Sequence, residues 1–179
     1  MTIHLARNGQ TAYNHEGRFQ GHLPVPLDDT GREQAAALAE AVTKVEIATL
    51  WCSPLARARE TADIVAARIG LEPVEDARFA ETDTGDWTDR SFAEVRAEDP
   101  GGFARFQRSD PTFRYPGGES FAEQSDRVQA GLADLRAQPA ALPALVVCHR
   151  GVIRLALAVA LGDEAAGARE IANASLVTL

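Results

Sequence analysis

Three short apolar runs, separated by segments of helical character, constrain most strongly what this chain can fold into. They span residues 2–6, 48–52 and 144–148, and the last two are almost continuously apolar, as is typical of strands covered on both faces. Helices are predicted over residues 30–44, 53–69, 120–138 and 152–161, with shorter strands near 71–74 and 175–179. Strands that alternate with helices predict an α/β fold: a three-layer α/β/α sandwich with a mostly parallel central sheet and helices on both faces.

The starts of two predicted helices carry capping signals. Thr30 with Glu33 three residues later predicts a capping box, in which Thr30 is the N-cap and Glu33 reaches back. Ser53 followed by Pro54 predicts a helix with serine as the N-cap and proline at its first position. Residues 7–29 read as a long polar connection without regular structure, and such a loop inside a compact domain is usually functional.

Length and composition indicate one domain, residues 1–179, large enough to bury a core without disulfides or metals. Residues 79–119 are less regular, and we expect them to form a helical cap that decides the substrate. A net charge of −8 argues against a nucleic acid or an anionic membrane as the partner. Cys52 and Cys148 lie in apolar runs and are expected to be small buried hydrophobic residues. With neither a leader nor a membrane-spanning run in view, we expect a cytoplasmic location.

Polar side chains directly follow the three apolar runs, where each predicted strand ends. They are Arg7 and Asn8 after the first run, Ser53 and Arg57 after the second, and His149 and Arg150 after the third. Taken singly, such an arginine is usually a solvated surface charge and such a histidine usually structural. Their shared location favours a site, because ligands of open α/β sheets bind at the carboxyl ends of the strands. Several guanidinium groups beside a helix N-terminus indicate phosphate as the ligand.

Five blocks of sequence, in order along almost the whole chain, resemble the signature of the histidine phosphatase superfamily with its phosphoglycerate mutase-like fold. The blocks are Leu5–Asn14 with Arg18–His22, Ser53–Ala62, Glu81 with Gly85–Trp87, Pro116–Ser120, and Val147–Arg154. The resemblance implies phosphoryl transfer in two steps without a metal or organic cofactor. In the family a histidine attacks phosphorus to form a phosphohistidine, an acid protonates the leaving oxygen, and water hydrolyses the intermediate.

The resemblance also implies roles for individual positions. Arg7, Arg57 and His149 would neutralise charge on the phosphoryl oxygens, and Glu81 matches the position of the general acid. The further positions expected to bind phosphate or substrate are Asn14, Gln20, Gly21 and Arg150. The family more often has a small residue at position 150, so Arg150 is expected to add charge or to narrow the pocket.

The position of the nucleophile holds Asn8 instead of histidine. A carboxamide nitrogen has no available lone pair, so the standard covalent route is closed, whereas its NH₂ group is expected to donate to a phosphate oxygen and preserve binding. Three explanations remain open: a substitution introduced into a working phosphatase, a natural pseudoenzyme that binds a phosphorylated ligand, or a rearranged mechanism in which His149 acts as base or nucleophile.

The predicted function is therefore that of a phosphomonoester hydrolase for a small phosphorylated metabolite, inactive or very weak as written. Phosphoryl transfer of the phosphoglycerate mutase type is a further alternative, although the segment from Glu81 to Gly118 is short for a mutase. The expected partners are inorganic phosphate or a small phosphorylated molecule, and a homodimer is kept open. The aromatic residues expected to form walls of the substrate pocket are Trp87, Phe92, Phe103, Phe106 and Phe113.

Overall fold

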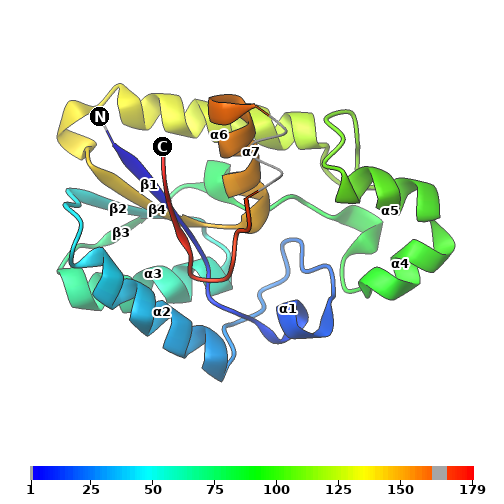
Figure 1. Cartoon of the computed structure of the whole chain (residues 1–179), viewed down its shortest axis with the longest axis horizontal. Coiled ribbons are helices and arrows are strands. Elements are labelled where there is room, and N and C mark those ends of the chain that lie inside the picture. Colours follow the sequence, from blue (N-terminus) through cyan, green and yellow to red (C-terminus); the bar gives the residue numbers. More distant parts are fainter. Residues whose placement is uncertain (1, 163–168) are drawn as a thin grey trace.

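The computed structural model describes residues 2–162 and 169–179, and over these residues the centre of the fold is a five-stranded sheet (Figure 1). The strands are β1 (Ile3–Arg7), β2 (Thr49–Cys52), β3 (Pro73–Glu75), β4 (Ala144–Cys148) and β5 (Leu176–Thr178), in the order β3-β2-β4-β1-β5. The first four run parallel, and β5 pairs antiparallel with β1 at one edge. The predicted, mostly parallel sheet is confirmed.

Helices cover both faces of this sheet (Figure 1). In chain order they are α1 (Ala12–Glu16), α2 (Asp29–Val42), α3 (Ala56–Ile69), α4 (Phe92–Glu98), α5 (Pro100–Gln107), α6 (Phe121–Arg136) and α7 (Arg150–Leu161). Alternate residues of β4 explain the two faces: Leu145 and Val147 pack with α2 and α3, whereas Val146 and Cys148 pack with α6 and α7. The result is the predicted three-layer α/β/α sandwich.

Both predicted N-caps are wrong. Helix α2 begins at Asp29, because the carboxylate of Asp28 accepts a hydrogen bond from Gly31 N at 2.7 Å and takes the cap position ahead of Thr30. Helix α3 begins at Ala56 with Leu55 as its N-cap residue. The Ser53 hydroxyl accepts from Leu55 N, but it also faces the ring of a buried histidine, which draws it away from the helix.

The connection from residue 7 to residue 29 is more regular than predicted. It contains α1, whose start is fixed by a capping box between Thr11 and Asn14. This five-residue helix has no buried residue, so no apolar stripe in the sequence indicates it. Among the described residues, no helix is long and apolar enough to cross a membrane.

Residues 79–119 carry α4 and α5 around an aromatic cluster beside the sheet. Its buried members are Phe19, Trp87, Val95, Phe103, Phe113, Tyr115 and Phe121. Three of the predicted pocket walls, Trp87, Phe103 and Phe113, are therefore interior residues of this segment, whereas Phe92 and Phe106 do line the pocket. Cys52 and Cys148 are buried free thiols, as expected.

Candidate functional site

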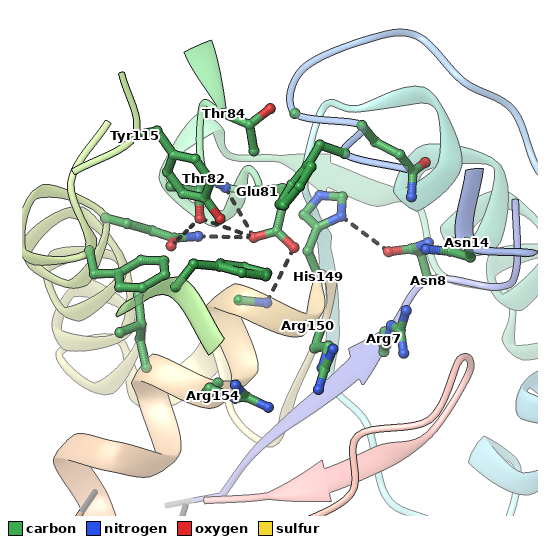
Figure 2. Close-up of a pocket in the computed structure, with 18 of the residues that line it drawn as sticks. Arg7, Asn8, Asn14, Glu81, Thr82, Thr84, Tyr115, His149, Arg150 and Arg154 are labelled. Carbon is green, nitrogen blue, oxygen red and sulfur yellow. Dashed lines mark hydrogen bonds between the residues drawn. The ribbon is translucent and has the colours of Figure 1, made fainter. Parts of the chain in front are cut away.

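A pocket opens at the carboxyl ends of β1 and β4, between the sheet and the segment that carries α4 and α5 (Figure 2). The structure brings all nine residues predicted for the site to its lining. They are Arg7, Asn8, Asn14, Gln20, Gly21, Arg57, Glu81, His149 and Arg150. Four of them, Arg7, Asn8, His149 and Arg150, lie at the ends of β1 and β4 or directly after them, where the parallel topology gathers segments distant in sequence.

Asn8 is held rigidly at the end of β1, with only 3% of its surface exposed. Its Nδ2 donates to the Gly9 carbonyl at 2.8 Å, and its Oδ1 lies 3.1 Å from His149 Nδ1 (Figure 2). The Gly9 carbonyl engages one N–H of this NH₂ group, so only the second N–H is left to donate to a phosphate oxygen, and that expectation stays a prediction. The amide oxygen is the atom turned toward His149.

His149 is almost completely buried, and both of its ring nitrogens have protein partners. Because Asn8 Oδ1 is an acceptor, Nδ1 must donate to it; Nε2 then accepts from the Ser53 hydroxyl at 2.7 Å. Burial, followed by the positive charges of Arg57 and Arg127, holds the pKa of His149 well below its ordinary value. The ring is therefore neutral, and its single N–H is donated to Asn8 Oδ1.

This arrangement does not favour His149 as a substitute nucleophile or base. The only lone pair on its neutral ring, at Nε2, is already hydrogen-bonded to Ser53 and points away from Asn8. A rearranged mechanism would first have to break that buried contact.

Two arginines, of which Arg57 is buried and Arg7 partly buried, supply positive charge beside Asn8. Arg57 is 2% exposed, and its Nη2 donates to the Gly21 carbonyl at 3.0 Å; Arg7 Nη1 donates to the Ile171 carbonyl at 2.7 Å. Burial is the main cause that lowers the pKa of each guanidinium to about 10, so both stay charged at neutral pH. Neither forms an ion pair with a carboxylate among the residues the structure describes. Their charge is thus available to an anionic ligand.

Two side-chain amides beside the arginines are oriented by their oxygens. Asn14 Oδ1 accepts from Thr11 N at 3.1 Å, and Gln20 Oε1 accepts from the Thr11 hydroxyl at 2.9 Å. Within the described residues their NH₂ groups have no hydrogen-bond acceptor, and both residues line the pocket. They can therefore donate to a ligand oxygen.

Glu81 stands on the wall of the pocket formed with α6 and α7 (Figure 2). Its Oε1 accepts from Thr82 N at 3.0 Å and from Gln124 Nε2 at 3.1 Å, and its Oε2 accepts from Gly151 N at 3.2 Å. A Cβ added to Gly151 would lie 2.3 Å from Glu81 Oε1. Only glycine therefore allows the carboxylate this close to the start of α7.

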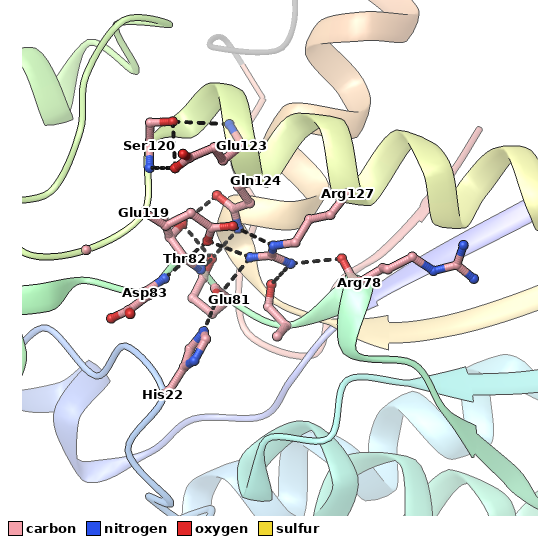
Figure 3. A network of polar contacts seen from close by, with 12 residues as sticks. His22, Arg78, Glu81, Thr82, Asp83, Glu119, Ser120, Glu123, Gln124 and Arg127 are labelled. Atoms are coloured by element: carbon pink, nitrogen blue, oxygen red, sulfur yellow. Dashed lines mark hydrogen bonds and ion pairs between the residues drawn. The ribbon is translucent and has the colours of Figure 1, made fainter.

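An ion pair between Arg127 of α6 and Glu119, which precedes this helix, fixes the backbone that carries Glu81 (Figure 3). Arg127 forms a bidentate pair with Glu119, at 2.7 Å and 2.8 Å. The same guanidinium donates to the carbonyls of Arg78, Ala80 and Glu81. His22 Nε2 approaches the Glu81 carbonyl to 2.7 Å, so this carbonyl is held from two sides.

The sequence reasoning missed several residues that shape the site. Tyr115, Gln124 and Arg154 line the pocket without having been predicted, and Arg127 acts from behind Glu81. Arg154 lies four residues after Arg150 on α7, and this spacing could have revealed it. Gln124 and Arg127 carry no comparable signal, because a polar residue within a helix usually faces solvent.

Within the described ranges, no group of three or more His, Cys, Asp or Glu side chains is placed to hold a metal ion. The polar lining of the pocket instead consists mainly of N–H donors and guanidinium groups. Such a lining binds tetrahedral oxyanions.

Comparisons with known proteins agree with this geometry. Residues 3–179 match the histidine phosphatase superfamily (branch 1). A probable phosphoglycerate mutase GpmB of Salmonella choleraesuis (strain SC-B67) is 34% identical over 149 residues, which are 83% of this chain and 69% of that protein.

Solved structures of similar proteins cover almost all of the chain. A mycobacterial glucosyl-3-phosphoglycerate phosphatase in complex with VO3 has a TM-score of 0.89 and 34% identity, with 99% of this chain and 91% of that chain covered. The same phosphatase with inorganic phosphate has a TM-score of 0.86 and 32% identity, with 99% and 88% covered. A putative alpha-ribazole-5'-P phosphatase from Escherichia coli K-12 has a TM-score of 0.87 and 29% identity, with 99% and 89% covered.

Proposed function

The chain belongs to the histidine phosphatase superfamily, branch 1, and from this premise we propose that its pocket binds the phosphoryl group of a small phosphomonoester in an arrangement suited to its hydrolysis. One observation carries the proposal: Arg57, which is buried, and Arg7, which is partly buried, line one pocket beside neutral His149 and have no carboxylate partner in the described chain. Buried cations that lack an anion are costly, and a phosphate would neutralise them.

The proposed roles follow from this placement. Arg7 and Arg57 bind the phosphoryl oxygens and stabilise the charge that spreads over them in the transition state, with the amides of Asn14 and Gln20 as further donors, while His149 orients Asn8 through its N–H. Gly21 leaves room for the ligand at the edge of the pocket and supplies the carbonyl that holds Arg57.

Glu81, on the other side of the pocket, is proposed to protonate the leaving oxygen. Its carboxylate lies on the wall where a leaving group would extend, and four contacts from Thr82, Gln124 and Gly151 fix its direction. A positioned acid of this kind typically contributes a factor of about 10²–10⁴ to the rate.

Asn8 prevents the covalent step, the transfer of the phosphoryl group to the side chain at position 8. Its amide oxygen cannot form a stable bond to phosphorus, so hydrolysis is limited to the residual rate that surrounding electrostatics provide. The alternative, a natural pseudoenzyme that binds a phosphorylated ligand, draws support from the same residue: both amide atoms of Asn8 have partners, so the site is complete without a phosphohistidine. Both readings require the phosphate to bind.

The short segment of residues 79–119 favours hydrolysis over mutase-type transfer. A mutase must exclude water from its phosphoenzyme while the substrate reorients. Here the pocket remains open beside the aromatic cluster, with Phe92 at its edge 38% exposed. Access of water is what a phosphatase requires.

The deciding experiment compares the protein that carries Asn8 with the variant Asn8→His. In the variant, Nδ1 would donate to the Gly9 carbonyl as Asn8 Nδ2 does, leaving the Nε2 lone pair directed into the pocket. We expect intact-mass spectrometry after incubation with a phosphodonor to show one added phosphoryl group in the variant only. Turnover of a panel of phosphomonoesters should rise by about 10³-fold or more.

Asn8→Gln is the matched control, because glutamine has a similar reach but no nucleophilic nitrogen. It should form no phosphoenzyme. Arg57→Ala, made in both backgrounds, should abolish phosphate binding in calorimetry. A phosphatase role is refuted if the Asn8→His variant gives neither phosphoenzyme nor turnover, and the binding role fails if the protein as written does not bind phosphate, vanadate or any phosphomonoester of the panel.

A further inference from the structure

Two arginines extend the positive charge of the pocket beyond the phosphate cradle formed by Arg7 and Arg57. Arg150 is the first residue of α7 and Arg154 lies one helical turn later, so both project from the same side of this helix. Figure 2 shows Arg154, Arg150 and Arg7 in succession along the lower edge of the pocket. The phosphate cradle alone gives no reason for such a row.

Neither arginine of α7 has an acidic partner in the described parts of the chain. Arg154 Nη1 donates to the Ser109 hydroxyl at 2.9 Å, while its Nε is buried and has no hydrogen-bond partner among the described residues. Buried donors are normally satisfied, so an unpaired guanidinium N–H at a pocket indicates a ligand acceptor. Elsewhere, arginines of this acidic chain pair readily with carboxylates, as Arg127 and Glu119 do.

The charges lining the pocket leave a surplus that one phosphate does not neutralise. Among the residues that the structure describes, four arginines, Arg7, Arg57, Arg150 and Arg154, line the pocket with one carboxylate, that of Glu81, and Arg18 is paired with Asp89 at 2.8 Å. A bound phosphomonoester carries a charge of about −1.5 to −2. At least one positive charge is still unmatched, in a chain whose net charge is −8.

The surplus lies on the side where a leaving group would extend. Arg150 is close enough to Arg7 to lower the pKa of that guanidinium, and it acts in the same way on Arg154. The row therefore starts at the cradle and continues outward along α7. Aromatic side chains that line the same pocket, including Phe106 and Tyr115, give the remainder of a leaving group an apolar wall.

We propose that Arg150 and Arg154 form a second anion subsite, which binds a carboxylate or phosphate group carried by the leaving group of the phosphomonoester. The inference rests on the proposed function only in that the phosphoryl group occupies the cradle of Arg7 and Arg57. It narrows the substrate class to phosphomonoesters with a second negative charge.

The test uses calorimetry on the protein as written, so that turnover does not interfere. Three probes share one phosphoryl group and differ in the other end of a three-carbon chain: glycerol 3-phosphate, 3-phosphoglycerate and glycerol 1,3-bisphosphate. We expect the two doubly anionic probes to bind at least about tenfold more tightly than glycerol 3-phosphate, the gain of one charge-assisted contact. The ratio between these two probes distinguishes a carboxylate site from a phosphate site.

Arg150→Gln and Arg154→Gln keep most of each side chain and remove its charge. Each should lower the preference for the doubly anionic probes severalfold, and the double variant should abolish it while inorganic phosphate still binds. Arg136→Ala, at the exposed far end of α6, is the matched control and should change nothing. Arg150→Lys should retain part of the preference, because it keeps the charge.

The outcomes separate the two proposals. If phosphate and all three probes fail to bind, the proposed function fails together with the subsite. If phosphate and glycerol 3-phosphate bind but the second charge brings no gain, or if the gain survives in the double variant, the subsite is refuted and the proposed function stands.

Discussion

Replacement of Arg127 by alanine should destabilise the protein far more than the loss of an ordinary surface ion pair. The guanidinium of Arg127 makes five hydrogen bonds, two to the carboxylate of Glu119 and three to the carbonyls of Arg78, Ala80 and Glu81. The side chains of the pair are only 22% and 16% exposed. The substitution leaves a largely buried carboxylate without its partner and removes the donor from three carbonyls.

The magnitude follows from this burial. Breaking a buried ion pair by removal of one partner costs about 3–5 kcal/mol, and the partial exposure of this pair places the expected loss near about 3 kcal/mol. For a chain of this size, a loss of about 3 kcal/mol lowers Tm by roughly 6–12 °C. Replacing both partners, as Arg127→Met with Glu119→Gln, should recover part of the loss because no isolated charge remains.

Thermal and urea unfolding of the three proteins provide the measurement. The matched control is Arg68→Ala, which breaks a bidentate pair with Glu40 whose side chains are 51% and 64% exposed, and which should leave Tm unchanged within error. In the Asn8→His background, Arg127→Ala should also lower kcat more than it raises KM, because it releases the backbone of Glu81. The reasoning is refuted if Arg127→Ala shifts Tm no more than Arg68→Ala does.

Three further predictions concern the site itself. Because the pKa of His149 is lowered in the folded protein, the unfolded chain binds a proton below pH 6.5 that the folded chain does not bind. The contribution of His149 to the free energy of unfolding should therefore be full above pH 6.5 and decline as the pH falls below that value. Chemical unfolding between pH 8 and pH 5 measures this decline, and a free energy of unfolding in which His149 contributes equally at all pH values would contradict it. Glu81→Gln removes the carboxylate that, among the described residues, faces the arginines of the pocket. Because this negative charge no longer competes with phosphate for the arginines, phosphate should bind severalfold more tightly in calorimetry. Weaker phosphate binding would argue against the proposed cradle. Gly21→Ala places a Cβ 2.5 Å from Thr84 Oγ1 at a backbone φ of +48°, and it should lower stability by about 1–3 kcal/mol and weaken ligand binding; an unchanged Tm would show that the loop yields.

The sequence by itself determined the architecture, because periodicity and apolar content are local properties. The near-continuous apolar residues of β4 could only be covered on both faces, and the alternation of strands with helices required a parallel sheet. That topology placed Arg7, Arg57 and His149 at one edge of the sheet. Strand bounds agree within about two residues, the usual uncertainty at element ends.

Only the tertiary structure decided which polar partner each group takes. Asp28 caps α2 rather than Thr30, two residues along the chain, so the choice lies between neighbouring local candidates. Ser53 turns to His149, which arrives from a distant segment, rather than serving as the N-cap of α3. The orientation of Asn8 depends on its hydrogen bonds to Gly9 and His149, which local sequence does not encode.

Local sequence likewise does not encode the partners of the charged side chains around the pocket. The helical pattern does not show what Arg127 meets, yet this residue is enclosed by Glu119 and three carbonyls; Arg154 lines the pocket with a buried N–H that has no partner among the described residues. Whether a charged side chain meets water, a carboxylate or a ligand is set by packing across the whole fold. Periodicity specifies which face of a helix is buried, but it does not specify what a polar residue meets there.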